Sequence, residues 1–171
     1  MEETKKKGLN TSSNSYTIIY SVVIVVIVAF LLAFVSSTLK PQQDENVALD
    51  KKKQILAALN IRDIDGAEAT EQYNKVVTAD KIIDRNGEEV EAGKQGGTEA
   101  GFLCNSASTK EGKLALYVCN VDGETKYVIP VYGMGLWGGI SGYIALNADK
   151  QTVYGAYFNH EGETAGLGAE I

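Results

Sequence analysis

One uninterrupted apolar segment near the N-terminus constrains this chain more than any other feature. It runs from Tyr16 to Val35, is dominated by Ile, Val, Leu and Phe, and carries no charge. About 20 residues at about 1.5 Å each span about 30 Å as a helix, which is the thickness of a bilayer's hydrocarbon core. A cleaved signal peptide is the alternative, but its apolar region has only about 7–15 residues and a small-residue cleavage site follows it closely. The sequence therefore predicts an uncleaved transmembrane helix over residues 16–36.

The positive charges around this segment predict its orientation. Lys5, Lys6 and Lys7 precede it, whereas only Lys40 follows it closely. Because cytoplasmic loops carry the excess of lysine and arginine, we expect residues 1–15 in the cytoplasm and the rest of the chain outside it. A second lysine cluster at residues 51–53 weakens the asymmetry, but it lies in a long exported segment, where charge has less influence.

The exported part, about 130 residues, is long enough to bury a modest core. The net charge of the whole chain is −6, and no basic patch with interleaved aromatic residues occurs, so the sequence does not indicate nucleic-acid binding. Cys104 and Cys119 are the only cysteines, and their spacing excludes a C-x-x-C redox or metal motif. They are expected either to form a disulfide between neighbouring strands or to be small buried apolar residues.

Two helices are predicted directly after the membrane segment. Residues 36–45 are predicted to form a polar connector that contains Pro41. A helix is then predicted from Asp44, as its N-cap, to Asn60, with an apolar stripe opposite the lysine cluster. A second, shorter helix is predicted over residues 66–77. Together these residues form a predicted connector and helical segment over residues 37–78.

After these helices, the sequence pattern becomes typical of antiparallel strands. Three hairpins are predicted, over residues 81–90, 114–131 and 140–158, and the first has the Asn86-Gly87 pair typical of a tight turn. Helices followed by strands in this order predict an α+β fold, in which residues 79–171 form an antiparallel-sheet domain.

Common enzyme motifs do not account for the polar residues of this domain. His160 is the only histidine, and no nucleophile elbow accompanies it. The sequence from His160 to Thr164 lacks the second histidine of a zinc-protease helix, so no metal site is predicted. There is no phosphate-binding P-loop and no G-x-G-x-x-G between a strand and a helix. We therefore predict no catalytic side chain.

Two glycine-rich stretches remain as candidates for a ligand site. The first runs from Tyr132 to Tyr143 around the sole tryptophan, and glycine there lets a planar ligand approach the backbone closely. A bulged strand connection with a core tryptophan is the alternative. The second runs from His160 to Gly168, where backbone N–H groups freed by a glycine turn can receive a carbonyl or an anion. Alone, it is more typical of an ordinary polar loop.

Taken together, the two stretches resemble a known family. Tyr-Gly-Met-Gly-Leu-Trp-Gly at residues 132–138, a hairpin, and His-Glu-Gly-Glu-Thr-Ala-Gly-Leu-Gly at residues 160–168 resemble the FMN-binding domain of the C subunit of the Na⁺-translocating NADH:quinone oxidoreductase. The G subunit of the related Rnf electron-transport complex shares the second motif, and a non-redox membrane-anchored assembly protein is a further alternative. The Leu-Trp-Gly of the first motif favours the oxidoreductase.

The resemblance implies a cofactor, a site and partners. Matched motif by motif, Trp137 and Gly138 would line the isoalloxazine of FMN. The other wall would consist of Glu163, Thr164, Leu167 and Gly168. In the family this flavin relays electrons while the complex oxidises NADH, reduces a quinone such as ubiquinone and exports Na⁺ across the bacterial inner membrane. The implied location of the main domain is periplasmic, and the implied partners are the other membrane and NADH-oxidising subunits and a flavin transferase. A single helix without an acidic residue offers no ion path, so Na⁺ would cross through the partners.

One part of the family pattern is missing. The family joins FMN through its phosphate to a threonine in a later Ser/Thr-Gly-Ala-Thr motif, which these residues lack. The nearest match, residues 65–68, has Glu68 where threonine is required, and a carboxylate cannot replace the hydroxyl that accepts the flavin phosphate. We therefore expect no covalent FMN threonine in this chain. We also expect the domain to be incomplete, and the isolated chain to be unstable and inactive.

Overall fold

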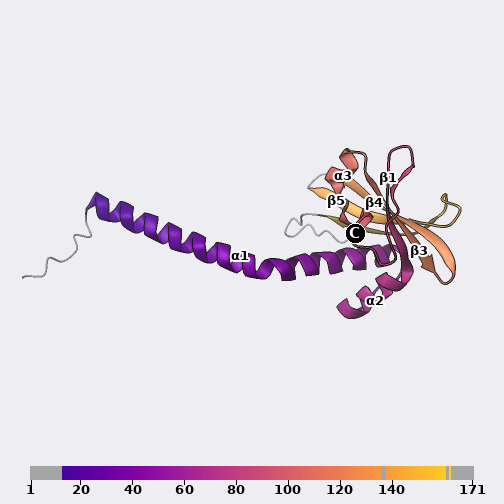
Figure 1. Cartoon of the computed structure of the whole chain (residues 1–171), viewed down its shortest axis with the longest axis horizontal. Helices are drawn as coiled ribbons and strands as arrows, with labels where there is room; N and C mark the ends of the chain where they lie inside the picture. Colours follow the sequence, from indigo (N-terminus) through magenta and orange to yellow (C-terminus); the bar gives the residue numbers. More distant parts are fainter. Residues whose placement is uncertain (1–12, 136–137, 161, 163–171) are drawn as a thin grey trace, which may run out of the picture. The chain divides into compact units, whose positions relative to one another are not determined.

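The computed structural model describes residues 13–135, 138–160 and 162 of the chain (Figure 1). The chain divides into two units, one up to Asn46 and one from Val47 onward. The first helix, α1 (Asn14–Ala58), includes residues of both units. Within the described residues, α1 is the one helix long and apolar enough to cross a membrane, because an 18-residue window in it reaches a mean hydropathy of 3.2.

The predicted connector is wrong, because residues 36–45 are helical. Pro41 lies inside α1, and Asp44 is an interior residue instead of an N-cap. A proline in a helix removes one backbone hydrogen bond and crowds the preceding turn, at a cost of about 3 kcal/mol. Here good helix formers surround it, and the Lys40 ammonium pairs with the Asp44 carboxylate one turn away at 3.0 Å. Polar residues indicated a loop, although the exposed surface of a helix is equally polar.

A Schellman motif ends α1. Asn60 adopts a left-handed conformation with φ of 62°. Its N–H donates to the Ala57 carbonyl at 3.0 Å, and the Ile61 N–H donates to the Leu56 carbonyl at 3.0 Å. The chain thereby reverses and enters α2 (Gly66–Val76), which confirms the second predicted helix within one residue.

The strands form one antiparallel sheet with the order β2-β1-β3-β4-β5-β6. Their bounds are β1 Val77–Ile83, β2 Glu89–Glu91, β3 Leu114–Val121, β4 Glu124–Met134, β5 Gly139–Leu146 and β6 Val153–His160. The three predicted hairpins are confirmed, and so is the α+β fold. Two short elements that the sequence did not indicate, η1 (Gly101–Leu103) and α3 (Ser106–Lys110), lie between β2 and β3.

The hydrophobic core lies on one face of the sheet, here called the core face. The strands contribute to it Ala115, Tyr117, Cys119, Val128, Tyr143 and Ala145. The last turns of α1 and the inner side of α2 cover this face with Ile55, Leu56, Leu59, Ala69 and Tyr73. The helical residues from Val47 onward thus share a core with the sheet. The predicted boundary at residues 78 and 79 separates secondary-structure types, whereas the division between the two units falls after Asn46.

A buried carboxylate fixes the long loop between β2 and β3. Asp80, on β1, is 1% exposed. Its Oδ1 accepts the Lys94 N–H at 3.1 Å, and its Oδ2 accepts the N–H groups of Ala100 and Phe102 at 3.1 and 3.3 Å. The Lys51 ammonium, from α1, donates to the carbonyl oxygens of Phe102 and Cys104. Residues 94–104 are therefore bound to the sheet from one side and to the helix from the other.

Candidate functional site

The two glycine-rich stretches meet at one end of the sheet. The first occupies the end of β4 and the start of β5, where Met134 pairs with Gly139. The second begins at the end of β6, where His160 pairs with Ile140 of β5. The Gly135 N–H donates to the Gly138 carbonyl at 2.8 Å and closes the turn between β4 and β5. Residues more than 20 positions apart in the sequence thus share one location.

The glycines at this end leave the backbone open. A Cβ atom added at Gly138 would lie 3.9 Å from the Gly162 nitrogen, so even a small side chain there would reach van der Waals contact with the second motif. A Cβ atom at Gly133 or at Gly162 would have no atom of the described residues within 4 Å. At Gly135 it would come within 2.8 Å of Ile140 Cδ1. We call the backbone of these four glycines the cradle, because glycine leaves a backbone accessible to close approach by another group.

Of the six residues predicted to contact a flavin, the structure places Gly138 in this cradle. The other five lie outside the described residues, namely Trp137, Glu163, Thr164, Leu167 and Gly168. Their contacts with a flavin therefore stay predictions. The described residues on either side, from Gly135 to His160, nevertheless fix the place where the two motifs approach each other.

The strand register adds neighbours that motif reasoning missed. Cross-strand partners share a face of a sheet, and here Gly133 pairs with Ile140 and Ile140 with His160. The next row along the same face joins Val131 to Gly142 and Gly142 to Phe158. We call these six residues, on the face opposite the core face, the distal patch: Val131, Gly133, Ile140, Gly142, Phe158 and His160. The strands themselves could be predicted from the sequence, but the register in which they pair could not.

On the core face, the same end of the sheet carries Tyr132 and Met134. Tyr132 pairs with Ser141, and burial, with a smaller effect of Cys104 nearby, raises the pKa of its phenol. Met134 is 84% exposed. An exposed apolar side chain is therefore present beside the cradle.

The two cysteines are both buried and free. Of the two open alternatives, the structure thus has the unpaired, buried thiols. Burial raises the pKa of the Cys119 thiol to about 12, and burial also raises the pKa of Cys104, against the opposing effect of the nearby Lys51 ammonium. Neither thiol is poised as a nucleophile, because the reactive form is the thiolate.

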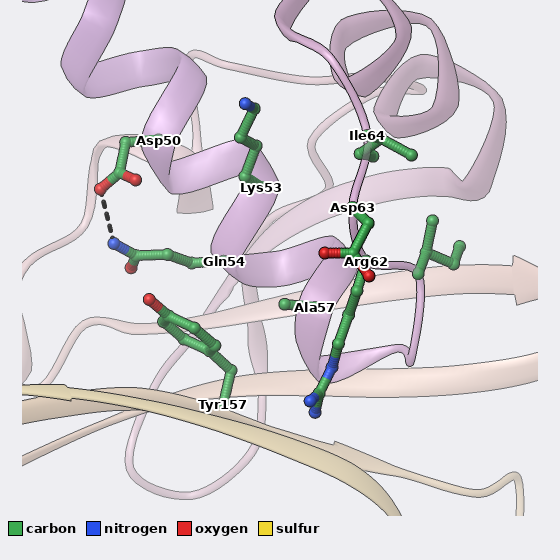
Figure 2. Close-up of a pocket in the computed structure, with 9 residues that line it drawn as sticks. Asp50, Lys53, Gln54, Ala57, Arg62, Asp63, Ile64 and Tyr157 are labelled. Carbon is green, nitrogen blue, oxygen red and sulfur yellow. Dashed lines mark hydrogen bonds between the residues drawn. The ribbon is translucent and has the colours of Figure 1, made fainter. Parts of the chain in front are cut away.

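A separate pocket of about 370 Å³ lies between the last turns of α1, residues 61–64 and Tyr157 of β6. Figure 2 shows the Asp50 carboxylate accepting a hydrogen bond from Gln54, at 2.7 Å, on one side of it. The Lys53 and Arg62 side chains point in opposite directions, so their charges do not converge on one ligand group. A ligand site usually has a few converging polar groups, and we assign no ligand to this pocket.

The fold and the cradle define a class of protein: an α+β domain after a candidate membrane-spanning helix, with glycine-rich stretches brought together at one end of its sheet. No protein-family model matches the sequence. The chain is, however, a homologue of the C subunit of the Na⁺-translocating NADH-quinone reductase, as the family resemblance predicted. It is 29% identical to that protein from Pseudomonas aeruginosa over 181 aligned positions, 95% of this chain and 69% of the relative. It is 33% identical to that from Haemophilus ducreyi over 150 aligned positions, 78% of this chain and 57% of the relative.

A solved structure gives the same result at the level of the fold. The crystal structure of the C subunit of the Na⁺-translocating NADH-quinone reductase from Parabacteroides distasonis superimposes with a TM-score of 0.67 at 37% sequence identity. The match covers 75% of this chain and 61% of the other. The chain thus spans less than two thirds of the length of that protein and of the Haemophilus ducreyi relative.

Proposed function

We propose that this chain is the flavin-binding subunit of a Na⁺-translocating NADH:quinone oxidoreductase, in which it relays electrons through FMN. The observation that carries the proposal is the approach of the two motifs at Gly138 and Gly162, which gathers glycine backbone where the family resemblance expects the isoalloxazine. The homology to proteins named as the C subunit of this reductase supports the oxidoreductase over an Rnf-type complex.

The chain's own contribution would be to bind and orient the flavin. Trp137 and Gly138 would lie on one side of the ring system, and the second motif would supply Glu163, Thr164, Leu167 and Gly168 on the other. Backbone N–H groups in glycine-rich turns donate to carbonyl and anionic oxygens, which suits the polar edge of a flavin. FMN, when bound, supplies the electron transfer, while the protein sets its position and surroundings.

The remaining roles in the proposal belong to partners. The anchor would hold the domain on the periplasmic side of a bacterial inner membrane, beside the other membrane and NADH-oxidising subunits. Quinone reduction and Na⁺ export would take place in those subunits. In the family a flavin transferase attaches FMN to a threonine. The Ser/Thr-Gly-Ala-Thr motif is not among these 171 residues, so a binding test of this chain must supply free FMN.

The test is a titration of the full chain, purified in detergent micelles, with FMN, followed by flavin fluorescence anisotropy. We expect saturable binding of one FMN per chain. Gly138→Val should weaken binding, because its branched side chain would fill the space between Gly138 and Gly162. Thr125→Ile, at the other end of β4, is the control and should bind as the unmodified chain does. No saturable binding by the unmodified chain, when circular dichroism shows that it is folded, would contradict the proposal and favour a non-redox assembly role.

A further inference from the structure

The motif match assigns no flavin contact to the six residues of the distal patch, although Gly133 and His160 lie within the motifs. Gly133 is exposed, and a Cβ atom there would meet no atom of the described residues within 4 Å. Its cross-strand neighbour Ile140, and Val131 on its own strand, are only partly buried. A glycine between partly exposed aliphatic side chains forms a shallow, apolar depression, which is the kind of surface a flat aromatic ring covers well.

One glycine of the cradle faces the same side of the sheet as this depression. A Cβ atom at Gly135 would approach Ile140 Cδ1 to 2.8 Å, so Gly135 turns toward the distal patch.

Phe158 borders the depression from β6. A Cβ atom at Gly142 would lie 2.7 Å from Phe158 Cδ1, which means that the phenyl ring rests on the bare backbone of its cross-strand partner. This arrangement holds the ring on the sheet, yet the side chain stays 41% exposed. Met134 and Tyr132 are also exposed aromatic or apolar residues at this end, but they belong to the core face.

We infer that Phe158 and the bare backbone of Gly133 are further flavin-positioning contacts of this site, so that the isoalloxazine lies on the distal patch. The inference rests on the proposed function and deepens it, because it names the face of the sheet and two residues outside the set that the motifs assign. Phe158 would pack against the edge or face of the flavin, and Gly133 would allow the ring to approach the strand backbone.

Two substitutions test this with the same FMN titration. Gly133→Val places a branched side chain in the depression, where its Cβ atom would meet no atom of the described residues within 4 Å, and we expect it to weaken FMN binding about tenfold or more. Phe158→Leu keeps an apolar side chain but removes the ring, and we expect a weakening of about threefold to tenfold. Phe158→Tyr keeps the ring and should bind within about twofold of the unmodified chain.

The control is again Thr125→Ile, which replaces a branched polar side chain by a larger branched apolar one on the same face of β4, about 26 Å from Gly133. Circular dichroism of each free variant tells a folding defect from a local effect. If the unmodified chain does not bind FMN, the proposed function fails. If it does bind FMN, and folded Gly133→Val and Phe158→Leu bind as tightly as Thr125→Ile, the flavin lies elsewhere and this inference is overturned while the proposed function stands. A variant that unfolds is replaced by Gly133→Ala, for which weaker binding than the control is expected and equal binding counts against the inference.

Discussion

Asp80→Asn is the change that most directly tests how this domain holds its long loop. The Asp80 side chain is 1% exposed and accepts three backbone N–H groups, one at Oδ1 and two at Oδ2. Asparagine can keep its oxygen at only one of the two positions. The best arrangement keeps the oxygen toward Ala100 and Phe102 and turns the NH₂ group toward the Lys94 N–H, where two donors then face each other.

The size of the effect follows from this count. One hydrogen bond to a charged acceptor is lost, at about 1.5–3 kcal/mol, and two others become bonds to a neutral acceptor, which are weaker. Removal of the charge relieves part of the cost of its burial. We therefore expect Asp80→Asn to lower the free energy of unfolding by about 2–4 kcal/mol. Glutamate cannot substitute, because a Cβ atom at Gly97 would already overlap Asp80 Oδ1, so the loop leaves no room for another methylene.

The assay is hydrogen exchange of the full chain in detergent micelles, read by mass spectrometry on peptides covering residues 92–103. A loss of about 2–4 kcal/mol corresponds to about 30- to 700-fold faster exchange where opening limits it. Asp84→Asn is the matched control, because Asp84 also accepts two backbone N–H groups, from Asn86 and Glu88, both at 2.8 Å, but does so in the exposed turn after β1. Equal acceleration by the two substitutions, or no acceleration by Asp80→Asn, would refute the reasoning.

Three further predictions concern local contacts. The Thr152 hydroxyl, at 2.6 Å, and the N–H groups of Thr152 and Gln151 lower the Asp149 pKa from 3.8 to about 2, so a ¹³C carboxyl titration should report a pKa of about 2. The Asp149 side chain therefore stabilises the fold above pH 3.8 and loses that effect as the pH falls toward 2. Asp149→Asn should remove this pH dependence of stability. Burial raises the Cys119 pKa from 9.0 to about 12, so the folded state holds more protons than the unfolded state between these pH values. The free energy of unfolding should therefore fall as the pH rises from 9 to 12. Iodoacetamide at pH 9 should label Cys119 far faster in urea than in the folded chain. Gly155→Ala should lower the free energy of unfolding by about 1–3 kcal/mol in thermal denaturation, because its Cβ would lie 2.4 Å from the Ala58 carbonyl oxygen. Gly133→Ala should be tolerated, because its Cβ would meet no atom of the described residues within 4 Å.

Local turn chemistry explains why most of the sheet could be predicted. Gly87, with φ of 85°, turns the first hairpin, and Asp122 and Gly123, with φ of 52° and 85°, turn the second, as expected for short hairpin loops. The helical residues 36–45 could not be predicted in the same way, because polar residues and one proline are compatible with both a loop and an exposed helix. The role of Asp80 was also hidden, since its partners lie 14–22 residues away along the chain.

The candidate site likewise has a part that could be predicted from the sequence and a part that could not. The family resemblance assigned Gly138 and the second stretch to two walls of one site, and the structure brings Gly138 near Gly162 of that stretch. The distal patch was not predictable from these motifs, because it depends on which residues of β5 and β6 pair. That register includes an irregularity between Ala145 and Leu146, and a shift by one residue would move Phe158 to the other face.

The central claim is that this chain works as the flavin-binding subunit of a Na⁺-translocating NADH:quinone oxidoreductase, and one purification tests it most directly. The tagged full chain is isolated from its native membranes in mild detergent, and the preparation is assayed for FMN and for NADH-driven quinone reduction with and without Na⁺. The account predicts co-purification with further membrane and NADH-oxidising subunits, FMN in the preparation, and quinone reduction that Na⁺ stimulates. Recovery of the chain alone, without flavin and without Na⁺-stimulated activity in the preparation, would contradict it.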